Sequence, residues 1–396
     1  MRLGVLFFAS ILERTGAGKV VRAFKEGESL FSQNGIQETN VYSLDFQKKI
    51  VPAGIQKKRS FKNKVFSLIN KMLQNTSYGS YTLVNKLYFD KGRLVVGYYW
   101  NSIQKDDVLL FHEIYTCNAY IERCEKYGIV PKPYILVLHT NGELFKMTYI
   151  YYPKLKGSRY MKKMESWADK CLERANGLVF VAQIAAENFL TLYPQYREKV
   201  NVVYNGIHDL PTEAKPIFDG QIRMVTVGTV NSRKNQILQI DAMRYLKPKC
   251  DVYLSIVGEG ALEECRVKAF ELGVEDRVEF LGGRDDIPEI LSQHNLFVMS
   301  SYDEGLPIAA IEAIRGKLPV ILTDVGGDKE LVKGNGFLIN PNLQELVDAV
   351  LTFSQSIEEQ KKMSIASRLL FESSFSLEKM IVGYCNIIKD LSDERK

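Results

Sequence analysis

Residues 296–315 read LFVMSSYDEGLPIAAIEAIR, which predicts an apolar strand, a turn and an apolar helix in direct succession. Pro307 suits the first helical turn, where its missing N–H leaves no hydrogen bond unmade. Gly305 lets the backbone approach a bound group closely. Because the first N–H groups of a helix have no partner within the helix, this turn predicts an anion site at the carboxyl end of a strand.

The same strand–turn–helix unit recurs through the second half of the chain. Short apolar stretches alternate with helical ones such as 261–272 and 308–315. This alternation predicts right-handed crossovers and a parallel sheet covered on both faces, as in a Rossmann-like domain. The strands predicted in this half are 223–227, 252–257, 278–281, 296–300, 319–323 and 336–339.

The first half follows the same rhythm less regularly, and residues 54–100 interrupt it. The apolar start of the chain is interpreted as a buried strand and not as a signal peptide, because Glu13 and Arg14 follow it without a small-residue cleavage site. The strands predicted in this half are 3–9, 108–112, 134–138, 178–181 and 200–203.

We therefore predict an α/β protein of two Rossmann-like domains that face a central cleft. The N-terminal domain is placed at residues 1–203 and the C-terminal domain at residues 204–375. A helix is predicted over 376–391, with Ser376 as its N-cap. We expect the segment 376–396 to return to the N-terminal domain and pack on it.

The net charge of +5 divides unevenly between the two halves of the chain. Residues 1–200 hold 30 Lys and Arg against 17 Asp and Glu, a balance of +13, and residues 201–396 hold 22 against 30, a balance of −8. A basic half suits nucleic acid, an anionic membrane or a phosphate-bearing acceptor. The six cysteines form no C-x-x-C pair, so we expect reduced thiols in a cytosolic protein, without a metal site or disulfide framework.

Glu312 is the one charged residue of the apolar stretch 308–314. A buried carboxylate needs a partner, and the two hydroxyls of a sugar diol match its two oxygens. The alternative, which Glu312 taken alone favours, is a surface glutamate that pairs with Arg315 one helical turn later.

Arg233 and Lys234 lie in the loop 228–236, which again follows a predicted strand and precedes a helix. Two adjacent positive charges at such a position are suited to a diphosphate. A solvated basic turn without a ligand is equally compatible with this pattern.

Two further features lie in the N-terminal half. Residues 15–19 read TGAGK and follow the first strand, but they lack the preceding glycine and the following Ser or Thr of a P-loop. Gly16 and Gly18 therefore indicate either a turn that a diphosphate can approach or a purely structural turn. His139 ends the strand 134–138, and His112 is placed similarly; each is a candidate site residue or a structural histidine.

In combination, these residues resemble the retaining glycosyltransferases of family 4, which have the GT-B fold. The resemblance covers nearly all of residues 200–340. Residues 203–207 (VYNGI) resemble the family's entry into its C-terminal domain, and residues 319–327 (PVILTDVGG) resemble a strand and turn of that domain. Glu304, followed by Gly-Leu-Pro and by Glu312 eight residues later, matches the family's E-x7-E signature. The N-terminal resemblance is confined to the glycine-rich turn, His139 and the rhythm of the strands.

The resemblance implies roles for these residues towards a nucleoside-diphosphate sugar. Glu304 would contact the donor sugar, Glu312 the ribose hydroxyls, and Lys234 the diphosphate. His139 would lie near the donor sugar and the acceptor, which makes Glu304, His139 and Lys234 the implied catalytic residues. The other implied donor-binding residues are Gly16, Gly18, Arg233, Gly282, Gly283, Arg284, Gly305, Leu306 and Pro307.

The chain departs from the family pattern at two positions. Thr229 replaces the arginine that usually follows the first glycine of its loop, and Ala17 interrupts the paired glycines of the N-terminal turn. Arg233 is our candidate for the missing charge.

By resemblance, the reaction transfers a sugar from a UDP- or GDP-linked donor to a hydroxyl and retains the anomeric configuration. The departing phosphate would take the acceptor's proton, so the protein would contribute positioning and charge stabilisation. The donor is a co-substrate, and we expect neither a cofactor nor a metal.

The acceptor is expected to bind the basic half. The basic run 57–64 overlaps an apolar stripe at helical spacing, and this segment either lies on an anionic membrane or packs on the N-terminal domain. The stripe consists of Phe61, Val65, Leu68, Ile69, Met72 and Leu73. A second basic cluster consists of Lys154, Lys156, Arg159, Lys162 and Lys163. Our hypothesis is a glycan or polyprenyl-linked oligosaccharide acceptor at the cytoplasmic face of the membrane, as in capsule, exopolysaccharide or O-antigen (lipopolysaccharide) assembly.

Three other functions are compatible with parts of the pattern. A sugar-nucleotide epimerase would use the same fold, and a non-catalytic partner subunit would keep the fold without turnover. A nucleic-acid-binding protein would account for the basic half, but it would leave the acidic C-terminal half and the E-x7-E signature unexplained.

Overall fold

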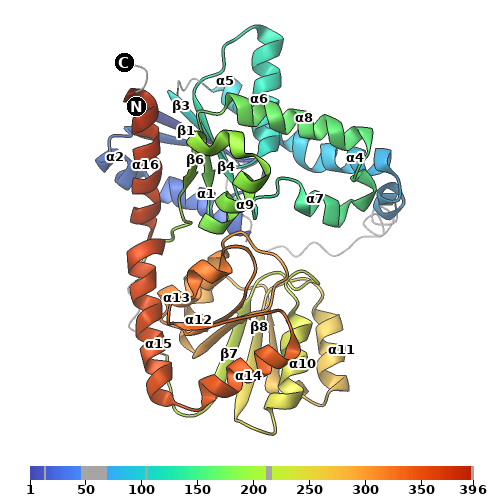
Figure 1. Cartoon of the computed structure of the whole chain (residues 1–396), viewed down its shortest axis with the longest axis vertical. Coiled ribbons are helices and arrows are strands. Elements are labelled where there is room, and N and C mark those ends of the chain that lie inside the picture. Colours follow the sequence, from blue (N-terminus) through green and yellow to red (C-terminus); the bar gives the residue numbers. More distant parts are fainter. Residues whose placement is uncertain (13–14, 46–68, 103–105, 211–215, 394–396) are drawn as a thin grey trace. The chain divides into compact units, whose positions relative to one another are not determined.

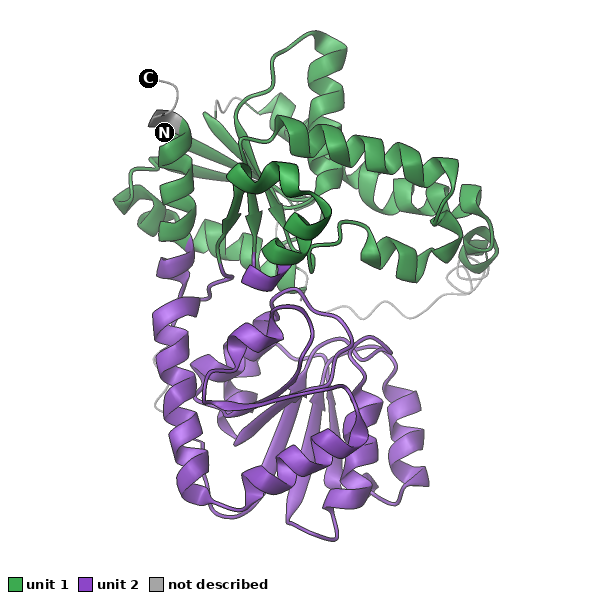
Figure 2. Cartoon of the chain, viewed as in Figure 1, with its two compact units in different colours: residues 1–180, 186–203, 381–396 green, residues 181–185, 204–380 purple. Residues whose placement is uncertain are grey.

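The computed structural model describes residues 1–12, 15–45, 69–102, 106–210 and 216–393. The chain divides into two compact units (Figure 2). Unit 1 consists of residues 1–180, 186–203 and 381 onward, and unit 2 of residues 181–185 and 204–380. The basic run 57–64 and the stripe positions Phe61, Val65 and Leu68 lie outside the described residues.

Unit 1 is built on a parallel six-stranded sheet in the order β2-β1-β3-β4-β5-β6. Every residue of β3, β4 and β5 is buried, as their uninterrupted apolar sequences predict. The edge strand β2 was not predicted, because its sequence ETNVY is half polar and only two of its residues are buried. The strands are β1 Arg2–Leu6, β2 Glu38–Tyr42, β3 Val108–Phe111, β4 Tyr134–Leu138, β5 Gly177–Phe180 and β6 Val200–Val202.

Helices cover this sheet, and several of them come from the segment that interrupts the strand rhythm. There the short π-helix Asn85–Phe89 joins α4 to α5 in one helical run, and α5 packs on α6. The α-helices are α1 Gly16–Glu26, α2 Glu28–Gln33, α4 Ser77–Val84, α5 Asp90–Asn101, α6 Ile114–Tyr127, α7 Lys146–Tyr151, α8 Arg159–Arg174, α9 Gln183–Leu192 and α16 Leu377–Asp393.

The C-terminal helix α16 begins in unit 2 and belongs to unit 1 from Ile381 onward. The Ser376 hydroxyl accepts the N–H of Lys379 at 3.3 Å, which is the N-cap that the sequence predicts. Within unit 1, the buried ring of Tyr384 packs edge-on against Phe24 of α1, with centroids 4.9 Å apart.

Unit 2 contains a second parallel six-stranded sheet, in the order β12-β11-β10-β7-β8-β9. All six strands lie within one residue of the predicted bounds, because each is a mainly apolar run between turn residues. The strands are β7 Ile222–Val227, β8 Val252–Val257, β9 Val278–Gly282, β10 Leu296–Met299, β11 Val320–Thr323 and β12 Gly336–Ile339.

The helices of unit 2 lie on both faces of this sheet (Figure 1). On one face α10 packs against α11 and α14, and on the other α13 packs against α15. The helices are α10 Gln236–Leu246, α11 Leu262–Glu271, α12 Ile287–Ser292, α13 Ile308–Arg315, α14 Leu343–Ser354 and α15 Ile357–Leu370.

Asn295, directly before β10, holds the amino ends of two central strands together. Its side chain is fully buried, and its oxygen accepts the N–H of Arg223 in β7 at 2.8 Å. Its amide nitrogen donates to the carbonyls of Ile217 and Gln221 at 2.9 and 2.7 Å. One buried side chain thus provides hydrogen-bond partners for one backbone N–H and two backbone carbonyls.

We predict that Asn295→Ala lowers the free energy of unfolding by about 2–4 kcal/mol, because backbone groups lose their partners inside the protein. The shift of the urea midpoint measures the effect. As a control, Gln344→Ala removes an exposed amide that bonds only Asp348, and is expected to stay within about 0.5 kcal/mol. An equal, small effect of both substitutions would contradict the role given to Asn295.

Candidate functional site

The order of strands in unit 2 determines where a ligand can bind. β7 and β10 are neighbours in the middle of the sheet, and the chain proceeds outward from them in opposite directions. The helices that follow these two strands therefore lie on opposite faces, which leaves a crevice at the carboxyl ends. The loops that follow β7 and β10 are residues 228–235 and 300–307, the two loops singled out from the sequence.

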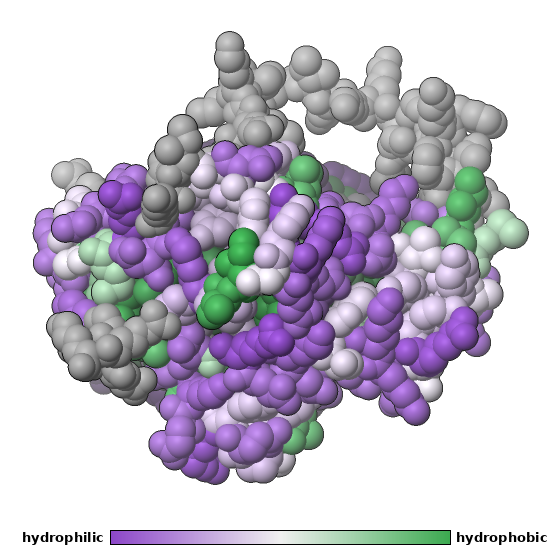
Figure 3. Space-filling model, turned by 90° about the horizontal axis from the view of Figure 1, so that it is seen from above, coloured by the Kyte–Doolittle hydropathy of each residue, from purple (hydrophilic) through white to green (hydrophobic). Residues whose placement is uncertain are grey.

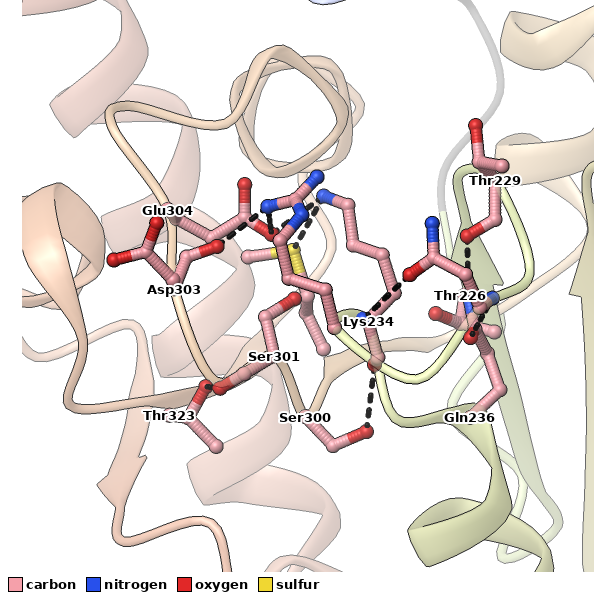
Figure 4. A network of polar contacts seen from close by, with 12 residues as sticks. Thr226, Thr229, Lys234, Gln236, Ser300, Ser301, Asp303, Glu304 and Thr323 are labelled. Atoms are coloured by element: carbon pink, nitrogen blue, oxygen red, sulfur yellow. Dashed lines mark hydrogen bonds and ion pairs between the residues drawn. The ribbon is translucent and has the colours of Figure 1, made fainter. Parts of the chain in front are cut away.

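An ion-paired cluster connects these two loops. The ammonium of Lys234 lies 2.6 Å from Oε1 of Glu304, and Nη1 of Arg233 lies 3.2 Å from the same oxygen. Glu304 is only 6% exposed, and the side chain of Lys234 reaches towards it (Figure 4). Burial acts to raise the pKa of Glu304, but the charges of Lys234 and Arg233 outweigh it and hold that pKa below its ordinary range.

The loop after β7 is shaped to direct Lys234 into this cluster. Gly228 has a φ of +152°, and a Cβ at that position would lie 3.6 Å from Cε of Lys234. The side chain of Asn231 accepts the N–H of Lys234 at 2.9 Å, and Asn235 takes a left-handed conformation before α10 begins. The turn therefore fixes the backbone of Lys234 while its side chain passes over a residue without a side chain.

The loop after β10 is held from two directions. The carbonyl of Gly305 accepts the N–H of Gly327 at 2.8 Å, and a Cβ on Gly327 would lie 2.4 Å from that oxygen. The carbonyl of Leu306 accepts the side-chain amide of Asn205 at 3.2 Å. Only glycine fits at position 327, so the Gly-Gly turn after β11 is needed to position Glu304 and its neighbours.

Pro307 lies directly before α13 and not in its first turn as predicted. Its φ of −75° is compatible with either position, and its carbonyl accepts the N–H groups of Ala310 and Ile311 at 3.1 and 3.2 Å. Pro307 is therefore the N-cap of α13, whose carbonyl accepts the first hydrogen bonds of the helix, and the first helical residue is Ile308.

Glu312 lies on α13 and is half-buried. Arg315, its partner in the surface-pair alternative, is itself only 6% exposed and donates to the carbonyl of His208 at 2.9 Å. Burial lowers the pKa of Arg315, while the charges of Glu312 and Asp209 act to raise it. Arg315 is thus an internal residue, and the charge of Glu312 acts on it from one helical turn away.

Asp328 belongs to the same cluster but was not singled out from the sequence, because an aspartate after Gly-Gly is typical of a solvated turn. It is fully buried, and neither carboxylate oxygen has a hydrogen-bond partner within the described residues. Burial raises its pKa well above the ordinary range, and the negative charge of Glu304 raises it further. A neutral Asp328 leaves two cations against one anion in the cluster.

The remaining candidates of unit 2 lie along the same edge of the sheet. The carbonyl of Gly282 accepts the N–H of Gly258, and the N–H of Gly228 donates to Val257, so the ends of β7, β8 and β9 are joined. Gly283 and Arg284 follow β9 directly. The guanidinium of Arg284 is exposed and bonded to Asp286.

In unit 1, Gly16 and Gly18, which the sequence assigns to a glycine-rich turn, lie in the first turn of α1. Thr15 caps this helix, and its hydroxyl accepts the N–H of Gly18 at 3.1 Å. Gly16 is exposed at the helix start. His139 follows β4 at the carboxyl edge of its sheet, as predicted from its position after an apolar run.

Two kinds of feature are absent from the described residues. Over these ranges no group of three or more His, Cys, Asp and Glu side chains is placed to hold a metal ion. Likewise, none of the helices assigned in the structure is long and apolar enough to cross a bilayer.

Fold and site define the class: two Rossmann-like units that form the GT-B fold. The structure of Anabaena Alr3699/HepE in complex with UDP covers 99% of this chain and all of its own, with a TM-score of 0.66 at 17% identity. The model of the group 1 glycosyl transferases matches residues 212–369. This match agrees with the resemblance to glycosyltransferase family 4 that the sequence indicates.

Two relatives from bacteria are similar to part of this chain. The Escherichia coli UDP-Gal:alpha-D-GlcNAc-diphosphoundecaprenol alpha-1,3-galactosyltransferase is 29% identical over 210 residues, which are 48% of this chain and 51% of that protein. The Vi polysaccharide biosynthesis protein VipC/TviE of Salmonella typhi is 30% identical over 39% of this chain and 30% of its own. The chain thus matches about half or less of the length of these two relatives.

Because Asp328 titrates differently in the folded and unfolded chain, it makes the free energy of unfolding depend on pH. Asp328→Asn removes this contribution. The folded pKa of Asp328 is raised, so above about pH 4 the unfolded chain loses a proton that the folded protein keeps. Stability of the natural protein therefore falls as pH rises, by up to about 1.4 kcal/mol per pH unit from this group.

We expect Asp328→Asn to be more stable than the natural protein between about pH 5 and pH 8 and to match it near about pH 3. Urea midpoints at each pH measure the difference. Substitution of the exposed Asp348 by Asn serves as a control and is expected to leave the slope unchanged. If the two substitutions gave parallel pH profiles, Asp328 would not be held neutral in the folded protein.

Proposed function

We propose that this chain is a retaining glycosyltransferase that transfers a sugar from a UDP-linked donor to a hydroxyl of a glycan or lipid-linked acceptor. The observation that carries the proposal is the cluster of Arg233, Lys234 and Glu304 at the strand-order reversal of unit 2. With Asp328 neutral, its net charge is positive, which suits a diphosphate. A UDP-bound structural neighbour and a UDP-galactose-dependent relative support uridine over guanosine.

In this proposal residues 204–375 form the donor-binding domain. Lys234 and Arg233 hold the diphosphate, and the N-terminus of α13 adds N–H groups beside it. Glu304 contacts the donor sugar, Glu312 the ribose hydroxyls, and the residues 282–284 the base. As the bond from the sugar to the phosphate breaks, the cations stabilise the leaving diphosphate, which takes the acceptor's proton.

Lys234→Ala is expected to weaken UDP binding about 10- to 150-fold, which corresponds to the loss of one charge-assisted hydrogen bond. Glu304→Gln removes a negative charge from beside the diphosphate, so it should bind UDP at least as tightly as the natural protein but lose donor hydrolysis. Calorimetry with UDP and the release of UDP from UDP-sugars measure the two effects. Lys333→Ala, an exposed lysine of unit 2, is the matched control.

The outcomes separate the alternatives. Unchanged UDP binding by Lys234→Ala would place the diphosphate elsewhere. Epimerised UDP-sugar formed without any acceptor would indicate an epimerase on the same fold. Binding of UDP-sugars without hydrolysis or transfer, in the natural protein and in both variants, would indicate a non-catalytic partner subunit.

We further propose that residues 1–203 form the acceptor-binding domain and that the acceptor is a polyprenyl-linked oligosaccharide of surface-polysaccharide assembly. The relative from E. coli, whose name specifies a diphosphoundecaprenol acceptor, supports a lipid-linked substrate. Lys154, Lys156, Arg159, Lys162 and Lys163 are all exposed along the start of α8 and the turn before it. This basic surface also carries the exposed rings of Tyr78 and Tyr151, a combination that favours an anionic membrane.

Any attachment of this kind is expected to be electrostatic and peripheral, on the cytoplasmic face of the membrane. Hydrophilic residues predominate on the molecular face drawn in Figure 3, with only scattered hydrophobic ones between them. Each basic residue near an anionic membrane surface contributes about 1 kcal/mol to binding. Such binding is therefore sensitive to the loss of single charges and to salt.

Vesicles that contain anionic lipid should retain the protein at low salt and release it at high salt. The triple variant Lys154→Ala, Lys156→Ala, Arg159→Ala should lose about 3 kcal/mol of this binding, measured by co-sedimentation. The control triple variant, Lys249→Ala, Lys333→Ala, Lys361→Ala, removes the same charge from exposed positions of unit 2. Equal loss in both triple variants, or no retention of the natural protein, would contradict this surface.

A further inference from the structure

Two histidines of unit 1 are paired at the carboxyl edge of its sheet. His112 follows β3 and His139 follows β4, and these strands are parallel neighbours. Nδ1 of His112 lies 3.0 Å from Nε2 of His139, and the rings are nearly parallel, with an interplanar angle of 18°. A hydrogen bond between two imidazoles needs one nitrogen with a proton and one without, so each ring determines the tautomer of the other.

The surroundings of His112 differ from those of His139. His112 is 2% exposed, and its ring contacts Phe24 edge-on at 5.1 Å between centroids. Its Nε2 is buried without a hydrogen-bond partner within the described residues. His139 keeps part of its surface exposed, and its bond to His112 is made through Nε2, which leaves its Nδ1 for another partner.

Both rings are neutral at neutral pH. Burial lowers the pKa of His112 well below its ordinary range, and the neighbouring His139 lowers it further. Burial likewise lowers the pKa of His139. The carboxylate of Glu113, next in the chain, is engaged by the N–H groups of Thr116 and Phe8. Each ring therefore carries one N–H, and only two arrangements of the two protons are compatible with the hydrogen bond.

In the first arrangement His112 donates from Nδ1, its buried Nε2 is a bare lone pair, and His139 carries its own proton on Nδ1. In the second, His139 donates from Nε2, and His112 must carry its proton on Nε2, a buried N–H without an acceptor. Buried N–H groups without a partner are rarer in proteins than under-satisfied acceptors. The first arrangement is favoured for this reason.

We infer that His112 is a positioning residue that holds His139 in the tautomer with its proton on Nδ1. His139 then presents a hydrogen-bond donor, and not a lone pair, to a bound sugar oxygen. This consequence rests on the proposed function, whereas the tautomer itself does not. The assigned tautomer excludes His139 as a general base in the protein without substrate, because the only unprotonated nitrogen of His139 accepts the hydrogen bond from His112.

The tautomer can be read directly from long-range 1H–15N correlations of the histidine side chains in the full-length protein at pH 7 without any substrate. The chain has only four histidines, and His208→Gln and His294→Gln assign two of the signals. We expect His112 and His139 both to carry their proton on Nδ1. A proton on Nε2 of His139, as in the second arrangement, or a doubly protonated ring, would overturn the inference.

Two substitutions test whether His112 sets this state. Asn at position 112 offers an amide N–H in place of Nδ1–H and should keep His139 in the Nδ1–H tautomer. Leu removes the donor, so His139 should shift towards Nε2–H, and kcat for sugar transfer should fall about tenfold, the equivalent of one hydrogen bond. Recovery of kcat in His112→Asn distinguishes this role from a merely structural one.

An unchanged His139 tautomer in His112→Leu would overturn the inference. If His112→Leu does not fold, the spectra of the natural protein and of His112→Asn still decide it. If the predicted tautomer is found but no sugar is transferred, the proposed function fails and the tautomer assignment stands.

Discussion

The candidate site depends on one topological constraint: the reversal of strand order between β7 and β10. In a parallel sheet all carboxyl ends lie at one edge, and right-handed crossovers place the helices that follow these two strands on opposite faces. Lys234 and Glu304 are 70 positions apart in the chain, yet they meet because their loops follow adjacent strands. Gly258 and Gly327 then allow the close approach of backbones that the crowded edge requires.

This geometry concentrates charge where water is scarce. An isolated carboxylate as buried as Glu304 would be costly, and the two cations beside it keep it ionised. Asp328 takes the opposite state in the same surroundings, because no cation or N–H group bonds to it within the described residues. Two carboxyl groups of one cluster thus differ in ionisation through their immediate partners alone. A polyanion that bound here would compete with Glu304 for the same cations. Before such binding, the ion pair with Glu304 holds the side chain of Lys234 in place.

The sequence predicted those elements whose residue pattern is compatible with only one structure. The six strands of unit 2 are mainly apolar runs between turn residues, which is why they could be predicted, whereas the half-polar edge strand β2 could not. Arg233, Lys234 and Glu304 were predicted singly, but their contact depends on strand order, which periodicity does not encode. Asp328 was missed because its burial results from the packing of the Gly-Gly turn against Gly305, a contact over 22 residues. Gly16 and Gly18 were assigned to a turn and not to the start of a helix, because Thr15 was not recognised as a helix cap.

The histidine pair shows how far local chemistry can be inferred when packing is known. From the sequence, His112 and His139 were two separate candidates at the ends of two strands. Their contact at 3.0 Å turns them into one unit with one proton between the two rings, and the lack of an acceptor for the buried Nε2 of His112 within the described residues decides which nitrogen holds that proton. A donor at His139 is consistent with a reaction in which the leaving phosphate accepts the proton, since no protein base is then required. The same edge of a parallel sheet therefore serves the two units differently: in unit 2 it gathers fixed charges, and in unit 1 it orients a neutral hydrogen-bond donor.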